Sequence, residues 1–279
     1  MSEPASPIGV FDSGVGGLTV LKALLAALPH ERFVYLGDTA RLPYGTKSSA
    51  TVARYAVQAA EALVGHGVKC LVVACNTAAS LGLPAIRDRV GELPVIGVIE
   101  PGAQAACTIS VSGSIAVLAT EATVRGGAYQ EAIRRRRPQA LLAAQPAPLL
   151  VALAEEGLVS GPIADAVVRH YLEPLFAHAP ASGSQPERPD TLVLGCTHFP
   201  MLAAVIRGVV GERVHVVDSA ATTAASVHAE LASAGLLARG TPLERIRLLA
   251  TDGPERFGRI GSRFLERVIT PQEVELVDL

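Results

Sequence analysis

The chain has 279 residues, enough for one large or two modest domains, because domains usually run to about 100 to 200 residues. Its 24 Lys and Arg stand against 26 Asp and Glu, without the basic excess typical of nucleic-acid-binding proteins. Hydrophobic residues make up 49% and charged residues 18%, which excludes an intrinsically disordered chain. We therefore expect a folded protein with no nucleic-acid partner.

Short apolar runs alternate with longer stretches of helical period, the pattern typical of α/β proteins with parallel sheets. Residues 7–11 predict a first strand, and a turn with the sequence DSGVGG connects it to a helix predicted over residues 18–28. This turn matches no nucleotide-binding glycine pattern, and we expect its glycines to permit a tight turn. Further strands are predicted at residues 32–36, 70–74, 94–98, 114–118, 191–195 and 213–217. Further helices are predicted at residues 51–65, 162–177 and 220–234, with a surface loop over residues 177–190.

No segment of the sequence predicts a membrane anchor. The longest uncharged stretch, residues 101–120, is interrupted by Pro, Gly, Ser and Thr, whereas a spanning helix needs about 20 mostly apolar residues. The first residues lack the basic and apolar regions of a secretory signal, so we expect a cytoplasmic protein. The four cysteines form no CxxC pair, and we therefore expect free thiols and no metal site.

Two segments of the chain resemble each other. One apolar strand ends at Cys75 and is followed 22 residues later by Gly97; a second ends at Cys196 and is followed at the same interval by Asp218. Both cysteines stand between a strand and a helix, at the carboxyl end where parallel sheets bind ligands. We therefore expect two related halves that place one thiol on each side of a cleft. Two unrelated strands that each end in Cys are the alternative.

Two thiols on opposite sides of a cleft are suited to inverting the configuration of a carbon atom bound between them. A thiol has a pKa of about 8.5, lowered at helix N-termini, so it can accept or donate a proton near neutral pH. One thiolate would remove a proton from one face of the carbon, and the opposite thiol would donate one to the other face. Nucleophilic catalysis would need only one activated cysteine, and the second cysteine would then have no evident function. A redox pair needs its sulfurs about 2 Å apart, which leaves no room for a substrate.

Five motifs occur in order along the chain, at residues 9–19 (GVFDSGVGGLT), 36–45 (LGDTARLPYG), 73–78 (VACNTA), 94–98 (PVIGV) and 194–200 (LGCTHFP). Together they closely resemble the glutamate racemases of the aspartate/glutamate racemase family. One departure is Phe199, where the family more often has Tyr, and it bears on packing rather than on chemistry.

The resemblance implies a cofactor-independent interconversion of L-glutamate and D-glutamate, with D-glutamate supplied to bacterial peptidoglycan. It implies that Cys75 acts on the α-proton of D-glutamate and Cys196 on that of L-glutamate. Supporting polar residues would be Asp12 near the first thiol and His198 near the second, with a carboxylate at Glu155 or the adjacent Glu156, of which we favour Glu155. The substrate contacts that the resemblance implies are Asp12, Ser13, Tyr44, Gly45, Asn76, Thr77, Thr197 and His198.

The residue types fit this substrate on their own chemistry. Glutamate has two carboxylates and one ammonium, so its site needs hydroxyl and amide donors as well as an acceptor. Ser13, Asn76, Thr77 and Thr197 can donate, and the helix starts after Asn76 and Thr197 add positive potential. The same residue types also favour simple N-cap positions.

The resemblance also implies two pseudo-symmetric three-layer α/β domains with mainly parallel central sheets and the active site at their interface. The first domain would comprise residues 1–99 and 226–279, and the second residues 100–225. We expect a homodimer, because family members often pair. Two alternatives stay open: a related racemase acting on aspartate or a hydantoin, and a non-catalytic amino-acid-binding or interaction protein, including a partner of a DNA-handling enzyme. The presence of both cysteines and Asp12 speaks against lost catalysis.

Overall fold

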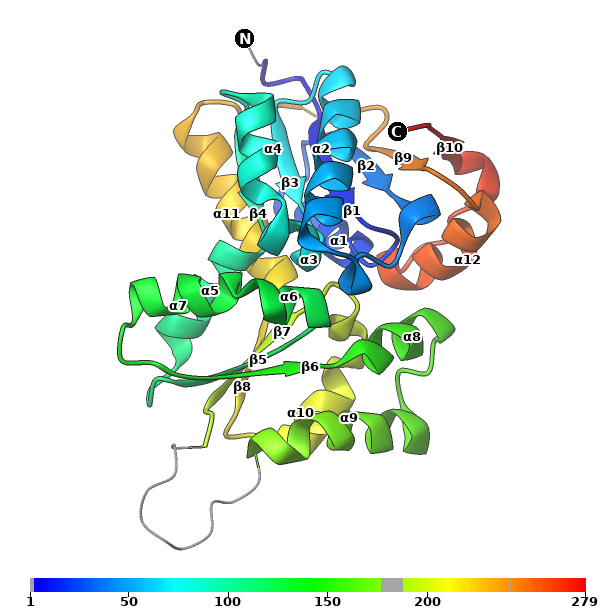
Figure 1. Ribbon diagram of the computed structural model, residues 1–279. Coiled ribbons are helices and arrows are strands. Elements are labelled where there is room, and N and C mark those ends of the chain that lie inside the picture. Colours follow the sequence, from blue (N-terminus) through cyan, green and yellow to red (C-terminus); the bar gives the residue numbers. More distant parts are fainter. Residues whose placement is uncertain (1–2, 177–187, 241) are drawn as a thin grey trace, which may run out of the picture.

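The computed structural model describes residues 3–176, 188–240 and 242–279, and its strands form two all-parallel sheets (Figure 1). The predicted loop at residues 177–190 lies almost entirely outside the described residues. The first sheet has the order β10-β9-β2-β1-β3-β4, with β1 Ile8–Asp12, β2 Phe33–Gly37, β3 Cys70–Val73, β4 Val95–Gly97, β9 Ile246–Ala250 and β10 Val274–Leu276. The second has the order β6-β5-β7-β8, with β5 Ser114–Ala119, β6 Leu141–Pro146, β7 Thr191–Gly195 and β8 His215–Asp218.

The two sheets share a topology. The order β2-β1-β3-β4 within the first sheet matches the order β6-β5-β7-β8 of the second, so β3 and β7 occupy the same place in their sheets. Each of these two strands leads into one of the paired cysteines, in agreement with the relation between halves that the sequence predicts. The predicted fold class of two parallel-sheet α/β domains is confirmed. We call the six-stranded sheet with its helices the first domain and the four-stranded sheet with its helices the second domain.

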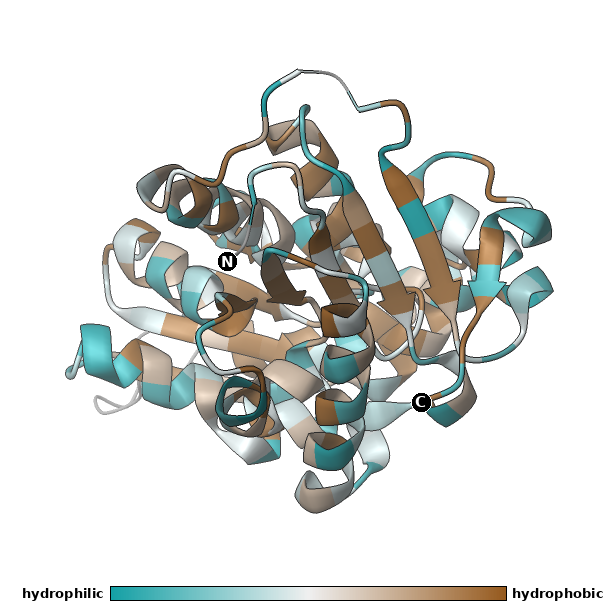
Figure 2. Ribbon diagram, turned by 90° about the horizontal axis from the view of Figure 1, so that it is seen from above, coloured by the Kyte–Doolittle hydropathy of each residue, from teal (hydrophilic) through white to brown (hydrophobic). Residues whose placement is uncertain are grey.

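Helices cover both faces of each sheet because parallel strands are buried on both sides. Every residue of β1, β2, β3 and β7 is buried, and in Figure 2 the strands form a brown interior bordered by the teal outer faces of the helices. In the first domain, α1 (Leu18–Ala27) packs with α11 (Ser219–Ser233) and α12 (Pro254–Leu265), and α2 (Ser49–Gly65) packs with α3 (Asn76–Leu81) and α4 (Leu83–Val90). In the second domain, α5 (Ile99–Ile109) packs with α7 (Ala128–Arg136), and α9 (Gly161–Phe176) packs with α10 (Ala203–Val210).

The remaining short helices lie near the junction of the domains (Figure 1). They include α6 (Glu121–Gly126), which contacts the 3-10 helix η2 (Tyr44–Thr46), and α8 (Pro148–Glu156), which contacts the 3-10 helix η3 (Phe199–Leu202). Two more 3-10 turns, η1 (Thr39–Arg41) and η4 (Pro271–Glu273), complete the described helical elements.

The domains share part of their hydrophobic core. One buried cluster runs from the six-stranded sheet through α5 and α11 to Ile115, Val117 and Ala119 on β5. Helix α11 contacts α1 and β4 of the first domain and also β7 of the second. The domain boundary predicted at residue 226 falls inside α11, and the boundaries stay a prediction. No helix in the described parts of the chain is long and apolar enough to cross a membrane.

Candidate active site

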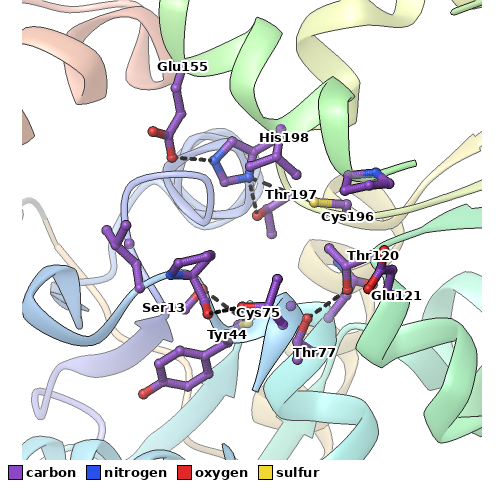
Figure 3. A pocket seen from close by; sticks show the side chains of 18 of the residues that line it. Ser13, Tyr44, Cys75, Thr77, Thr120, Glu121, Glu155, Cys196, Thr197 and His198 are labelled. Atoms are coloured by element: carbon purple, nitrogen blue, oxygen red, sulfur yellow. Dashed lines mark hydrogen bonds and ion pairs between the residues drawn. The ribbon is translucent and has the colours of Figure 1, made fainter. Parts of the chain in front are cut away.

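A cavity of about 300 Å³ lies where the carboxyl ends of the two sheets face each other (Figure 3). It brings together ten residues predicted from sequence: Ser13, Tyr44, Gly45, Cys75, Asn76, Thr77, Glu155, Cys196, Thr197 and His198. The other lining residues were not predicted: Gly14, Leu42, Pro43, Thr46, Thr120, Glu121, Pro148, Val151 and Ala152.

The first thiol sits at the start of α3. Cys75 is the N-cap of this helix, and its Sγ accepts a hydrogen bond from the Ala78 backbone N–H at 3.4 Å. The thiol itself donates to Ser13 Oγ at 3.4 Å. Burial, followed by the charge of Asp12, raises the pKa of Cys75 to about 12, and the contacts with Ser13 and Ala78 only partly oppose this. Burial therefore outweighs the helix N-terminus, and Cys75 is a neutral thiol at neutral pH.

The second thiol has a cationic neighbour. Cys196 Sγ lies 3.8 Å from His198 Nδ1, and His198 Nε2 lies 3.2 Å from Glu155 Oε1. Burial lowers the pKa of His198, but its hydrogen bonds with Cys196 and Glu155 outweigh burial and raise the pKa to about 10. The ring is therefore an imidazolium at neutral pH, and it can stabilise negative charge on Cys196.

Glu155, rather than Glu156, is the carboxylate beside His198. Its two oxygens are shared between His198 and Arg256, whose Nη2 lies 2.7 Å from Oε2. The hydrogen bond with His198 lowers the pKa of Glu155, assisted by the charges of His198 and Arg256. The side chain of Glu156 is exposed and does not line the cavity.

Asp12 lies behind the cavity wall rather than on it. Its side chain is buried, and Oδ2 accepts the backbone N–H of Gly14 at 3.0 Å. Burial raises the pKa of Asp12, while the charge of His198 and backbone N–H groups of the following loop oppose the rise. Asp12 therefore influences Cys75 and His198 electrostatically without lining the cavity.

Amide and hydroxyl groups form one wall of the cavity. Asn76 Oδ1 accepts a hydrogen bond from Tyr129 at 2.7 Å, which orients the amide, while the buried Nδ2 has no hydrogen-bond partner among the described residues. The Thr77 hydroxyl lies 3.0 Å from that of Thr120. Nδ2 is thus a donor available to a ligand. Thr120 follows directly after β5, and its place just past an apolar strand was the signal that could have identified it.

The loop that carries Tyr44 is held in place by hydrogen bonds to the buried carboxylate of Asp38. Tyr44 donates a hydrogen bond to Asp38, which also accepts Arg41 Nε at 2.7 Å and the Thr251 hydroxyl at 3.0 Å. Burial raises the pKa of Tyr44, so its hydroxyl stays protonated. The backbone at Gly45 passes close to Thr120, because a Cβ there would lie 3.1 Å from the Thr120 Cβ.

The glycines after β1 allow close packing rather than an unusual turn. Positive φ angles occur at other glycines but not at Gly14, Gly16 or Gly17. A Cβ at Gly16 would lie 2.5 Å from the His198 ring, and one at Gly17 would lie 2.5 Å from the Asp12 Cβ. The expected tight turn is present at Gly16 and Gly17, where the Leu18 backbone N–H donates to the Val15 carbonyl at 3.1 Å. In addition, Gly16 lets the first domain approach His198 on the second.

The cavity has little positive charge of its own. None of the described residues that line it is Lys or Arg, and two of them, Glu121 and Glu155, are acidic. Lys69 is buried elsewhere, 2.6 Å from Glu31, and Lys22 pairs with Glu266 on the surface. Across the described ranges, no three His, Cys, Asp or Glu side chains converge so as to hold a metal ion. An anionic ligand in this cavity would therefore be held by His198, hydroxyls, amides and backbone N–H groups.

Comparison with known proteins agrees with this geometry. The family model described as Asp/Glu/Hydantoin racemase matches residues 8–227. The chain belongs to this family. It is 47% identical to the glutamate racemase of Geobacter metallireducens, over 94% of this chain and 93% of that protein. It is 45% identical to that of Neisseria gonorrhoeae, over 98% and 97%. The predicted racemase is confirmed at the level of an amino-acid racemase of this family.

Solved structures show the same relationship. The glutamate racemase of Francisella tularensis, in complex with D-glutamate, has a TM-score of 0.89 and 33% identity, covering 99% of this chain and 98% of that chain. That of Thermus thermophilus, in complex with β-chloro-D-alanine, has a TM-score of 0.86 and 43% identity, covering 100% and 99%. The Escherichia coli enzyme, with a TM-score of 0.74 and 30% identity over 98% of both chains, was solved with L-glutamate and the activator UDP-MurNAc-Ala. A regulator of that kind was not predicted for this chain.

Proposed function

We propose that this protein is a cofactor-independent glutamate racemase that moves the α-proton between two cysteines. The observation that carries the proposal is that Cys75 and Cys196 line one cavity, each from the carboxyl end of a strand in a different sheet. The curated relatives quoted above are glutamate racemases, which favours glutamate over aspartate or a hydantoin.

In the direction from L-glutamate to D-glutamate, Cys196 begins as the thiolate beside the imidazolium of His198. It takes the α-proton, and the electron pair of the broken C–H bond stays on the α-carbon next to the carboxylate. The neutral thiol of Cys75 then donates its proton to the opposite face. The products are D-glutamate, a Cys196 thiol and a Cys75 thiolate, and the reverse direction exchanges the two roles.

The polar residues bind and orient the substrate. Asn76 Nδ2, Thr77 and Thr197 donate to its carboxylates. The backbone N–H groups of Tyr44 and Gly45 and those at the starts of α3 and η3 add further donors. Ser13 faces the ammonium group, and the buried carboxylate of Asp12 behind it adds negative potential there without touching the substrate. Asp12, Glu155 and His198 support the thiols. This arrangement places donors where negative charge develops at the reacting carbon.

The proposal extends to the cellular role. D-glutamate made here supplies peptidoglycan synthesis, the protein acts in the cytoplasm, and it forms a homodimer, all as expected from the family resemblance. The first domain comprises residues 1–99 and 226–279 and the second residues 100–225, so that substrate binds between them.

The test uses the purified protein in D₂O without added cofactor. L-glutamate should lose its circular dichroism signal while deuterium enters the α-position, as followed by NMR, and L-aspartate should not react. Activity should survive chelators and carbonyl reagents. Reaction of aspartate alone would transfer the proposal to a related racemase, and no reaction with either amino acid would point to a binding protein.

A further inference from the structure

Helix α12 of the first domain holds the Glu155–His198 pair of the second domain from three positions. Arg256 Nη2 lies 2.7 Å from Glu155 Oε2. Two turns further along the helix, Arg263 Nη1 donates to the Glu155 backbone carbonyl at 3.0 Å. The Phe264 ring meets the His198 ring edge-on, with their centroids 5.2 Å apart. One helix thus fixes the backbone and side chain of Glu155 and one face of the histidine.

The two carboxylate oxygens of Glu155 have separate partners. Arg256 takes Oε2, which leaves Oε1 directed at His198 Nε2 at 3.2 Å. The opposite ring nitrogen, Nδ1, faces Cys196 Sγ at 3.8 Å. The contacts therefore run in one line from Arg256 through Glu155 and His198 to the reacting thiol, although Arg256 itself does not line the cavity.

We propose that Arg256 is a positioning residue for racemisation: it fixes the Glu155 carboxylate so that His198 keeps its ring orientation and charge beside Cys196. The inference rests on the proposed function. A guanidinium presents a planar set of donors that suits a carboxylate and cannot lose its proton, so it holds one orientation better than a solvated lysine does. Without Arg256, Glu155 can turn into the adjoining cavity of about 100 Å³, which both residues line.

The direction in which the alkaline limit of activity moves distinguishes a positioning role of Arg256 from a direct effect of its positive charge on His198. His198 is faced by Cys196, Glu155 and Asp12, and Glu155 is faced in turn by Arg256. If Arg256 acted only through its positive charge, its removal would let His198 keep its proton to higher pH. If Arg256 holds Glu155 in place, its removal weakens the contact that keeps His198 protonated. The alkaline limit of activity then moves to lower pH.

The experiment compares Arg256→Gln, Arg256→Lys and Glu155→Gln with a control on the same helix. Arg259→Gln serves as control because its side chain is exposed and has no hydrogen bond or ion pair among the described residues. We expect Arg256→Gln to lower kcat by about ten-fold, with little change in KM and an alkaline limit displaced to lower pH. Arg256→Lys should recover part of kcat, and Arg259→Gln should match the wild type.

A double-mutant cycle tests the order of the contacts. If Arg256 acts through Glu155, the double variant Arg256→Gln/Glu155→Gln is no slower than Glu155→Gln alone. Independent, multiplying losses would overturn the proposal. So would an unchanged pH profile of Arg256→Gln, or an alkaline limit displaced to higher pH.

An NMR titration of His198, which needs no catalytic turnover, distinguishes failure of the role proposed for Arg256 from failure of the proposed racemase function. The ring of His198, identified by NMR through the signal lost in His198→Asn, should titrate at lower pH in Arg256→Gln than in the wild type. If the wild type racemises glutamate but His198 titrates at the same pH in Arg256→Gln as in the wild type, only the role of Arg256 is overturned. Failure of the wild type to racemise glutamate would overturn the proposed function, whatever the histidine does.

Discussion

At the scale of single residues, the two thiols differ in their surroundings. Cys75 is held neutral by burial and by Asp12, whereas Cys196 faces an imidazolium. The proposed mechanism needs both, so Cys75→Ser and Cys196→Ser should each lower racemisation by about 1,000-fold or more, since a serine hydroxyl is a far weaker acid than a thiol. Circular dichroism of glutamate measures the rate, and far-ultraviolet spectra check the fold. Wild-type racemisation by either variant would refute the two-thiol mechanism.

The adjacent glutamates allow a matched comparison. Only Glu155 contacts His198 and Arg256, while Glu156, the last residue of the same helix, is exposed and does not line the cavity. Glu155→Gln should lower kcat by about ten-fold or more because His198 loses a charged partner. Glu156→Gln should stay within about two-fold of the wild type, as expected of a surface substitution. Equal losses in the two variants would contradict the assignment.

His198 also makes stability depend on pH. Its pKa of about 10 in the folded protein exceeds the value of about 6.5 expected when unfolded. The stabilisation is therefore fully present below about pH 6.5 and is lost as the pH rises towards about 10, by at most about 1.4 kcal/mol per pH unit. Glu155 titrates below this window and does not contribute to the slope.

Urea unfolding at about pH 6 and about pH 9 measures this effect. The wild type should exceed His198→Asn in free energy of unfolding by more at the lower pH than at the higher one. A difference that stays constant between the two pH values would show that folding does not raise the pKa of His198.

At the scale of elements, the loop between β1 and α1 has to approach η3 of the other domain. Gly16→Ala introduces a Cβ 2.5 Å from the His198 ring, so we expect the ring to be displaced and racemisation to fall by about 100-fold. Gly208→Ala in α10 is the matched control, since a Cβ there meets nothing within 4 Å. The control should keep full activity and gain up to about 1 kcal/mol, because alanine favours the helix. Full activity of Gly16→Ala would contradict the close contact.

The elements also explain how far the sequence could predict the fold. Strands such as β1, β3 and β7 are continuous buried apolar runs, and the predicted ranges agree with them to within one or two residues. Strand β6 was missed because its sequence, LLAAQP, contains no β-branched or aromatic residue and is only half-buried. The parallel partner β5 imposes its extended backbone.

The site residues likewise divide into those that the sequence could predict and those that it could not. The residues next to strand ends, such as Cys75 and Cys196, could be predicted because their position and chemistry are both local to the motif. Arg256 lies beyond the last motif, in a segment that sequence patterns did not connect to the site. Its contact with Glu155 joins residues 101 positions apart and depends on how α12 crosses towards α8. Contacts of this kind are a consequence of domain packing.

At the scale of the whole molecule, segments distant in sequence are fastened at the amino ends of the strands. Lys69 is buried 2.6 Å from Glu31 and also donates to the carbonyl oxygen of Leu236 at 2.8 Å. Glu31 accepts the backbone N–H of Ala238 at 2.8 Å. This cluster ties the start of β3 to the chain that leaves α11, the helix that also contacts the second domain.

Because one apolar cluster continues from the first domain into β5, we expect both domains to unfold together. Lys69→Met leaves Glu31 buried without its charge partner and should cost about 3 to 5 kcal/mol. Differential scanning calorimetry should show one transition for the wild type and one, at lower temperature, for the variant. If glutamate binds between the domains as proposed, it should raise both midpoints, since it then binds the folded protein and not the unfolded chain. If instead the variant unfolds in two steps, with a second midpoint unchanged from the wild type, the domains are independent and the shared core does not couple them.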